Sequence, residues 1–183
     1  TTDPWQLVYD GFDPAHEGHR EALTALGNGY LATRGARPEH HDDGIHYPGT
    51  YLAAVYNRLA STIHGRELEE EHLVNTPNWL PVDLRIGDGP WLSTGQVVTH
   101  SEQRELDLRR GLVVRRAVLT AGNGDRLDFV QTTFTSLDEP HLAVLETTLT
   151  APDWSGTVTL RAGIDAGVRN SNVAAYLGSD ATH

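Results

Sequence analysis

The stretch GLVVRRAVLTAGNGDRLDFVQTTF, residues Gly111–Phe134, decides the fold class of this chain. Two runs rich in β-branched and aromatic residues flank the pair Asn123-Gly124, and both runs have the composition of strands. The Asn-Gly pair tolerates the positive φ angles that a type I′ turn requires. The stretch therefore predicts an antiparallel β-hairpin.

Strand patterns continue on both sides of this hairpin. In TVTLRAGI, residues Thr157–Ile164, apolar and other residues alternate, which is the period of a half-buried strand. The apolar face of that strand consists of Val158, Leu160, Ala162 and Ile164. The segments Arg126–Phe134, His141–Thr150 and Val82–Ile86 also have strand composition. We therefore predict an all-β fold, a β-sandwich of two packed antiparallel sheets with one or two short helices.

Helical patterns are weak. Asp13 as N-cap and Pro14 in the first turn predict a helix that runs to Gly27. A second short helix is possible over Arg58–Ile63. The polar stretch Ala36–Gly49, with prolines near both ends, is expected to be a surface loop.

Composition excludes several classes of function. The chain has 14 basic and 25 acidic residues, a net charge of -11, and every basic residue is arginine. An acidic surface argues against nucleic acid and anionic membranes as partners. The absence of cysteine excludes disulfides and thiolate chemistry. No signal peptide and no apolar run near the ~20 residues of a membrane helix are present, so we expect a cytoplasmic protein.

The glycine-rich stretch LGNGYLATRG, residues Leu26–Gly35, raises the possibility of phosphate binding. Gly27 and Gly29 match half of the dinucleotide fingerprint, but no βαβ pattern surrounds them. We therefore expect the glycines of this stretch to form tight turns and not to bind a nucleotide.

Two groups of residues have the chemistry of metal ligands. His16 and His19 are three residues apart on the predicted helix. The second group lies in the polar loop: His40, His41, Asp42, Asp43 and His46. Closed zinc sites need four ligands with supporting hydrogen bonds, and a His/Asp-rich loop is more often solvated. We expect no metal and no cofactor.

One acidic run and one tryptophan motif have residue types that could act on or bind a sugar. Glu69-Glu70-Glu71 is a run of like charges, which usually forms a solvated face. In NTPNWLP, the prolines Pro77 and Pro81 would hold Asn78 and Trp79 rigidly. Trp79 could plug one end of the sandwich or stack on a sugar, and both interpretations stay open.

Seven motifs occur in an order that resembles the N-terminal domain of glycoside hydrolase family 65. They are GFDP, LGNGYLATRG, PGTYLAAVYN, LVNTPNWLP, LDLRRGLVVRR, SLDEPHLAVLETTL and DWSGTVTLRAGIDAGVRN. The resemblance runs from about Trp5 to Asn172. The family includes maltose, trehalose, kojibiose and nigerose phosphorylases and related hydrolases.

The resemblance implies a galactose-mutarotase-like β-supersandwich, followed in the family by a helical linker, a catalytic (α/α)6 barrel and a small sheet. The catalytic glutamate and the phosphate site belong to the barrel, so residues 1–183 would form most of the N-terminal domain and hold no catalytic residue. A chain without methionine that begins Thr1-Thr2 is likewise expected to come from a longer protein.

The function implied is that of a non-catalytic accessory domain of an inverting α-glucoside phosphorylase or hydrolase of carbohydrate metabolism. It would support its own barrel and shape the active-site entrance or the interface of a homodimer. The substrates would be disaccharide α-glucosides such as trehalose or maltose, with inorganic phosphate as co-substrate of a phosphorylase. Candidate substrate-binding residues are Asn28, Tyr30, Arg34, Asn78 and Trp79.

The same motifs give two local expectations. Asn28 is expected to hydrogen-bond locally and Arg34 to anchor its loop through a carboxylate or backbone carbonyls. The family usually has glycine at the positions of Ala32 and Ala54, and alanine disfavours the positive φ angles that glycine accepts.

Two other functions remain possible from the sequence. A stand-alone carbohydrate-binding module is compatible with a sandwich that contains four tryptophans. A mutarotase-like epimerase would need a His/Glu pair on a concave sheet, for which His100 with Glu102 or Glu146 is the nearest candidate.

Overall fold

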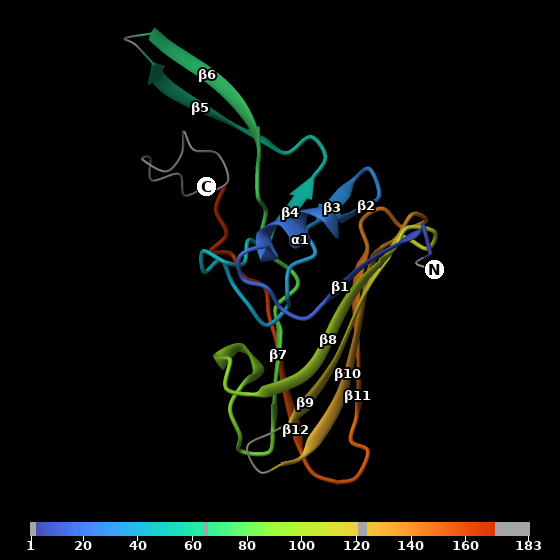
Figure 1. Ribbon diagram of the computed structural model, residues 1–183. Helices are drawn as coiled ribbons and strands as arrows, with labels where there is room; N and C mark the ends of the chain where they lie inside the picture. The colour runs from blue at the N-terminus through green and yellow to red at the C-terminus, as the bar shows by residue number, and fades with distance from the viewer. Residues whose placement is uncertain (1–2, 64–65, 121–123, 171–183) are drawn as a thin grey trace.

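A computed structural model describes residues 3–63, 66–120 and 124–170 (Figure 1). Antiparallel strands make up nearly all of the regular secondary structure in the described ranges. The elements are β1 Gln6–Asp10, α1 Glu17–Leu23, β2 Leu26–Gly27, β3 Leu31–Thr33, β4 Thr50–Leu52, β5 Tyr56–Ile63, β6 Arg66–Leu73, β7 Val82–Ile86, a 3-10 helix Leu92–Thr94, β8 Val98–Asp107, β9 Leu112–Thr120, β10 Arg126–Thr135, β11 Ala143–Thr150 and β12 Val158–Ala162. The predicted all-β class is confirmed.

The largest sheet has five strands in the order β1-β8-β9-β10-β11. The predicted hairpin lies at its centre, because β9 and β10 pair antiparallel with Leu119 opposite Leu127. Gly124, the second residue of the predicted Asn-Gly turn, has a φ of 93°. Asn123 lies outside the described residues, so the turn type stays a prediction.

A two-stranded sheet of β7 and β12 packs on one face of the five-stranded sheet and forms the sandwich. Alternate residues of β9 and β10 point inward, and Leu119 and Phe129 are each only 1% exposed. The buried cluster between the layers comprises Leu84, Ile86, Leu92, Ala117, Leu119, Leu127 and Phe129. Two further sheets, β2-β3-β4 and β5-β6, lie outside this pair of layers, so two sheets were too few. Figure 1 shows β5 and β6 projecting from the rest of the molecule.

β12 forms as predicted, but its apolar face is only partly covered. Leu160 lies opposite Leu84 of β7, which is 2% exposed. Leu160 itself is 52% exposed, and Ile164 beyond the strand is 75% exposed. The prediction of a half-buried face is therefore wrong for Leu160, Ala162 and Ile164, and of the four residues of this face only Val158 packs partly buried against the core.

Both helix predictions need correction. α1 begins at Glu17, because the Asp13 carboxylate accepts a hydrogen bond from the backbone N–H of Ala15 and holds a turn before the helix. It ends at Leu23, since the chain then pairs as β2. The possible helix over Arg58–Ile63 is instead part of β5. No helix in the described ranges is long and apolar enough to cross a membrane.

The stretch Ala36–Gly49 is not a simple surface loop. Its first four residues, 36–39, and its last four, 46–49, are buried or half-buried, and only the middle, 41–45, is exposed. The prediction was based on polarity, but the charged residues at the start of the stretch turn toward the five-stranded sheet.

Ala54, just before β5, has a φ of 63°, the one positive φ of a non-glycine residue in the part of the chain described here. The left-handed conformation that the family's glycine suggested is thus kept with alanine. Ala32 lies in β3 and has no such angle.

Candidate functional site

The inner face of the five-stranded sheet carries charged residues next to the apolar core. Arg104 of β8 lies opposite Arg115 of β9, and Arg115 lies opposite Gln131 of β10. All three are buried, with 5%, 6% and 3% exposure. Like charges directly opposite each other destabilise a sheet, so this pair of arginines requires compensation.

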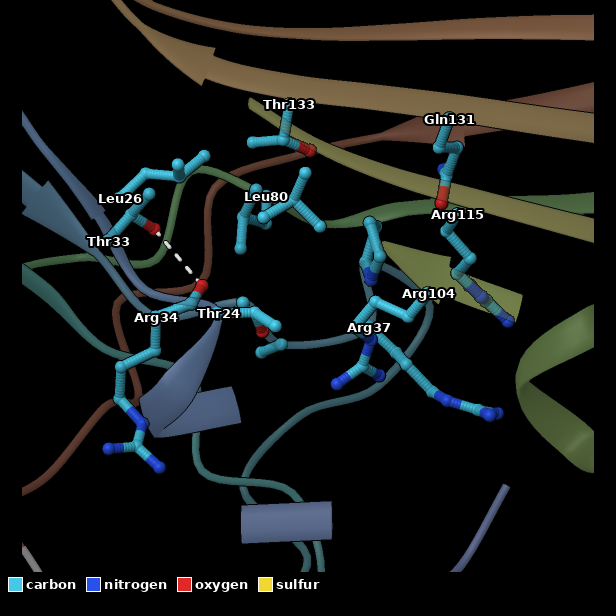
Figure 2. Close-up of a pocket in the computed structure, with 14 residues that line it drawn as sticks. Thr24, Leu26, Thr33, Arg34, Arg37, Leu80, Arg104, Arg115, Gln131 and Thr133 are labelled. Carbon is cyan, nitrogen blue, oxygen red and sulfur yellow. Dashed lines mark hydrogen bonds between the residues drawn. The ribbon is translucent and has the colours of Figure 1, made fainter. Parts of the chain in front are cut away.

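Carboxylates from α1, from the segment after β3 and from β8 itself supply that compensation. Both terminal nitrogens of Arg115 donate to Glu39, at 2.7 and 2.6 Å. Arg115 Nε also donates to Glu102 at 2.7 Å, and Arg104 donates to Glu17 of α1. The buried charge cluster, as we call it, consists of Glu17, Arg37, Glu39, Glu102, Arg104 and Arg115. Figure 2 shows its three arginines on one side of a small cavity.

The cluster keeps the Glu39 carboxylate ionised. Burial raises the pKa of Glu39, but the charge and hydrogen bonds of Arg115 outweigh it and bring the pKa to about 2. Burial lowers the pKa of Arg115, yet Glu39 and Glu102 raise it above the ordinary arginine value overall. A carboxylate with so low a pKa cannot hold a proton near neutral pH, so Glu39 cannot serve as a general acid.

Next to the cluster lies a stack of aromatic rings. His46, 2% exposed, has its Nδ1 3.0 Å from a carboxylate oxygen of Glu21. The His40 ring stacks on it with centroids 4.2 Å apart and planes 14° apart, and Phe12 stacks on it at 5.7 Å. Burial lowers the pKa of His40, which favours its neutral form.

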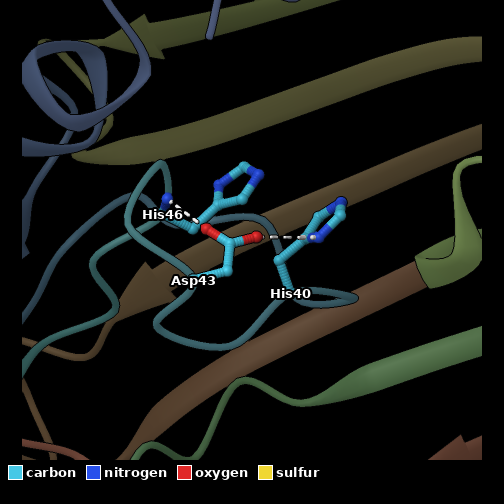
Figure 3. Close-up of side chains that lie close together, drawn as sticks. All are labelled: His40, Asp43 and His46. Carbon is cyan, nitrogen blue, oxygen red and sulfur yellow. Dashed lines mark hydrogen bonds and ion pairs between the residues drawn. The ribbon is translucent and has the colours of Figure 1, made fainter.

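The stacked histidines include two possible metal ligands. His40, Asp43 and His46 hold possible ligand atoms within 4.8 Å of one another, as Figure 3 shows for the three side chains. Ring nitrogens bind metals through lone pairs in the ring plane, and those of two nearly parallel rings do not converge on one ion. The ring of His40 or that of His46 would have to rotate before both could bind the same ion. His16 is engaged elsewhere, 2.7 Å from Asp13. The absence of a metal stays our expectation.

Asn28 and Tyr30 lie at the turn between β2 and β3. The Asn28 side-chain oxygen accepts hydrogen bonds from the backbone of Tyr30 and Leu31, at 3.0 and 2.8 Å. Its amide donates to the carbonyls of Ser136 and Pro140 in the β10–β11 loop, at 2.6 and 2.9 Å. Asn28 therefore caps its own turn, as predicted, and also ties two distant motifs together.

Arg34 ties the stretch Ala36–Gly49, which follows β3, to α1. Its Nε donates to the Tyr47 carbonyl at 2.8 Å and its Nη2 to the Gly18 carbonyl at 2.7 Å. The Glu21 carboxylate is 3.8 Å away. Of the two predicted kinds of partner, a carboxylate or backbone carbonyls, the hydrogen bonds go to backbone carbonyls.

Asn78 and Trp79 lie beside the segment after β12. Asn78 is 1% exposed and exchanges two backbone hydrogen bonds with Asp165, at 2.8 and 2.9 Å. Trp79 is half-buried, and its indole nitrogen has no hydrogen-bond partner among the described residues. The choice between a plug and a sugar contact stays open.

The five candidate substrate-binding residues thus have three separate sets of partners. Only Arg34 lines the cavity beside the buried charge cluster. None of the five lines a larger surface groove of about 350 Å³ that runs from Pro38 to Asp165. Substrate binding by these residues remains a prediction.

The His/Glu pair of the epimerase hypothesis does not form. His100 is exposed, with its Nε2 2.8 Å from the hydroxyl of Thr120. Glu102 belongs to the buried charge cluster, whereas Glu146 is exposed on β11. The two carboxylates therefore have quite different surroundings, and neither is paired with His100.

The buried charge cluster was missed in the sequence. One signal was present: Arg115 falls on the same alternation as Val113, Ala117 and Leu119, and so occupies an inward position of β9. Its partner Glu39 could not be found this way, because it comes from an irregular segment 76 residues earlier.

The comparisons with known proteins agree with this architecture. The chain matches the family model described as glycosyl hydrolase family 65, N-terminal domain, over residues 7–182, and it belongs to this family. The predicted resemblance is confirmed. A putative kojibiose phosphorylase from the human microbiome shares the fold, with a TM-score of 0.76 and 21% identity over 87% of this chain and 21% of that one.

Relatives with related sequences are much longer. An uncharacterized glycosyl hydrolase of Mycobacterium tuberculosis is 43% identical over 95% of this chain and 13% of its own length. Trehalose 6-phosphate phosphorylase of Lactococcus lactis is 30% identical over 98% of this chain and 23% of its own. Kojibiose phosphorylase of Halothermothrix orenii is 28% identical over 96% of this chain and 21% of its own length. The chain spans less than a quarter of each of these relatives.

Proposed function

We propose that this chain is a non-catalytic accessory domain of an inverting α-glucoside phosphorylase or hydrolase. It supports a catalytic barrel elsewhere in the full protein and shapes the active-site entrance or the interface of a homodimer. The similarity to kojibiose and trehalose 6-phosphate phosphorylases supports disaccharide α-glucosides as substrates of the whole enzyme, with inorganic phosphate as co-substrate if it is a phosphorylase.

The observation that carries the proposal is the uncovered edge at β12. Leu160, which lies opposite the buried Leu84 of β7, exposes 52% of its surface, and Ile164 just beyond β12 exposes 75%. They adjoin the surface groove, which is lined by both Ala162 and Ile164. Apolar residues grouped at a sheet edge favour contact with another protein surface.

The carboxylates of the groove support a non-catalytic role. Asp83 accepts hydrogen bonds from Ser93 at 2.7 Å and from Arg161 at 2.9 Å. A hydrogen bond from the backbone of Gly167 and the neighbouring His41 lower the pKa of Asp165. Inverting hydrolysis needs a protonated acid opposite a nucleophile or base, and a carboxyl whose pKa is lowered, like that of Asp165, is a poor acid.

An activity assay tests the proposal. The purified chain is incubated with kojibiose, trehalose or maltose, with and without inorganic phosphate, and release of glucose or glucose 1-phosphate is measured. We expect no release. Turnover that disappears when one of the chain's own carboxylates, such as Asp83 or Asp165, is replaced by its amide would refute the proposal. Tight binding of a free glucan without turnover would favour the carbohydrate-binding module instead.

The docking edge is tested in the intact parent enzyme. Leu160→Ser and Ile164→Ser should lower its thermal stability or its activity, because they would place a hydroxyl in an apolar contact. Leu137→Ser is the matched control, since Leu137 is 85% exposed in the β10–β11 loop. Equal effects of all three substitutions would argue against docking at β12.

A further inference from the structure

The small cavity of Figure 2 lies between the inner face of the five-stranded sheet and the segment that follows β3. Its volume is about 20 Å³, and a single water molecule needs about 10–15 Å³ of such space. The cavity is therefore large enough for one water and too small for a sugar or a phosphate. Its wall combines apolar side chains with polar ones from β8, β10 and the segment after β3.

Three buried polar atoms of the wall have no hydrogen-bond partner in the described structure. They are Arg37 Nε, Arg104 Nη1 and Gln131 Oε1. Their residues are 9%, 5% and 3% exposed, so bulk water does not reach them freely. Buried polar groups in native proteins almost always have a partner, and the residues that carry these three atoms all line the cavity.

The charges around the cavity argue against an anion. Arg37, Arg104 and Arg115 are balanced by the three carboxylates of the buried charge cluster, through contacts of 2.6 Å between Arg37 and Glu102 and between Arg115 and Glu39. The cluster has one glutamate for each arginine, and Arg34, the fourth arginine that lines the cavity, is 3.8 Å from the buried carboxylate of Glu21. A neutral ligand that can both donate and accept hydrogen bonds fits this balance.

We propose that the cavity is a binding site for one ordered water molecule. The water donates a hydrogen bond to Gln131 Oε1 and accepts one from Arg104 Nη1, from Arg37 Nε or from both. Through Arg104 it links β10 to β8, and through Arg37 it links β10 to the segment that carries Arg37 and Glu39. Such a water is part of the fold and holds the buried charge cluster in place.

A high-resolution crystal structure of the protein tests the assignment directly. We expect density for one water within hydrogen-bond distance of Gln131 Oε1 and of Arg104 Nη1 or Arg37 Nε. A crystal soaked in bromide distinguishes a water from a halide, because bromide gives an anomalous signal. An anomalous peak in the cavity, or a cavity without density, would overturn the proposal.

A substitution tests the energetic role. Gln131→Met keeps the length of the side chain and removes the acceptor, and Gln96→Met makes the same change at an exposed position. We expect Gln131→Met to lower the melting temperature by about 2–8 °C relative to Gln96→Met, from the cost of an unsatisfied buried donor. A Gln131→Met protein as stable as Gln96→Met would show that the site is dry. If the variant fails to fold, the wild-type crystal structure alone decides.

Discussion

Arginine–glutamate pairs occur in two contrasting regions of this molecule, beneath the five-stranded sheet and on the β5–β6 hairpin. The closest contact between Arg115 and Glu39 is 2.6 Å, and their side chains are 7% and 2% exposed. The contact between Arg58 and Glu71 is 2.9 Å, and their side chains are 66% and 58% exposed. The chemistry and the distances are nearly the same, so the comparison isolates the effect of solvent.

The difference teaches where a charge matters to the fold. In the buried charge cluster, removal of one partner leaves the other charge in a medium that does not solvate it. On the hairpin, water and salt take the place of a lost partner. The cluster also joins α1 and the segment after β3 to two strands of the sheet, whereas the hairpin pair joins only β5 to β6.

The largest expected effect comes from breaking the buried pair. Glu39→Gln leaves Arg115 short of one carboxylate and should reduce the free energy of unfolding by about 3–5 kcal/mol. Urea denaturation followed by fluorescence measures this loss. Glu71→Gln is the matched control on the hairpin, and a loss from Glu39→Gln no greater than that of the control would contradict the comparison.

Acid should weaken the same pair in the wild-type protein. Folding lowers the pKa of Glu39 from 4.5 to about 2, so its stabilisation is complete above the unfolded value and is lost as the pH falls from 4.5 through 2. The loss from this residue is of the order of 3 kcal/mol. The free energy of unfolding, measured between neutral pH and pH 2, should show this loss. In the Glu39→Gln variant the free energy of unfolding should fall less steeply over the same acid range. If the free energy of unfolding fell equally steeply with acid in the wild-type protein and the variant, the pH dependence would belong to other carboxylates.

A smaller effect is expected at the root of the hairpin. Ala54 has a left-handed backbone, which glycine adopts without the clash of a β-carbon, so Ala54→Gly should raise the free energy of unfolding by about 0.5–1 kcal/mol. Ala53→Gly is the control, because Ala53 has no positive φ and should lose stability instead. Thermal unfolding compares the two variants. A loss of stability in both would show that glycine does not relieve backbone strain at position 54.

The smallest effect is expected for the exposed pair itself. Glu71→Gln should change the free energy of unfolding by less than about 0.5 kcal/mol, and added salt should reduce the change further. Denaturation at low and high ionic strength provides the measurement. A salt-independent loss comparable to that of Glu39→Gln would mean that the hairpin pair is covered by another part of the full protein.

Much of the fold followed from local pattern. The hairpin of β9 and β10 was predicted from composition and the Asn-Gly pair, and Val82–Ile86 was predicted residue for residue, because strand preference and turn chemistry act over a few neighbours. The helix boundaries were wrong, because Asp13 caps a turn rather than a helix. Arg58–Ile63 became a strand through pairing with β6, which no local signal contained.

The sequence by itself determined the all-β class, the central hairpin and the membership of glycosyl hydrolase family 65, since these depend on periodicity and on motifs in order. Tertiary structure alone decided that Arg115 meets Glu39, that Asn28 holds the β10–β11 loop, and that Leu160 stays exposed. These contacts join residues far apart in the chain, and burial of a charge or exposure of an apolar side chain depends on which segments cover it. Periodicity reports which way a side chain points, and only the packed structure supplies what it meets.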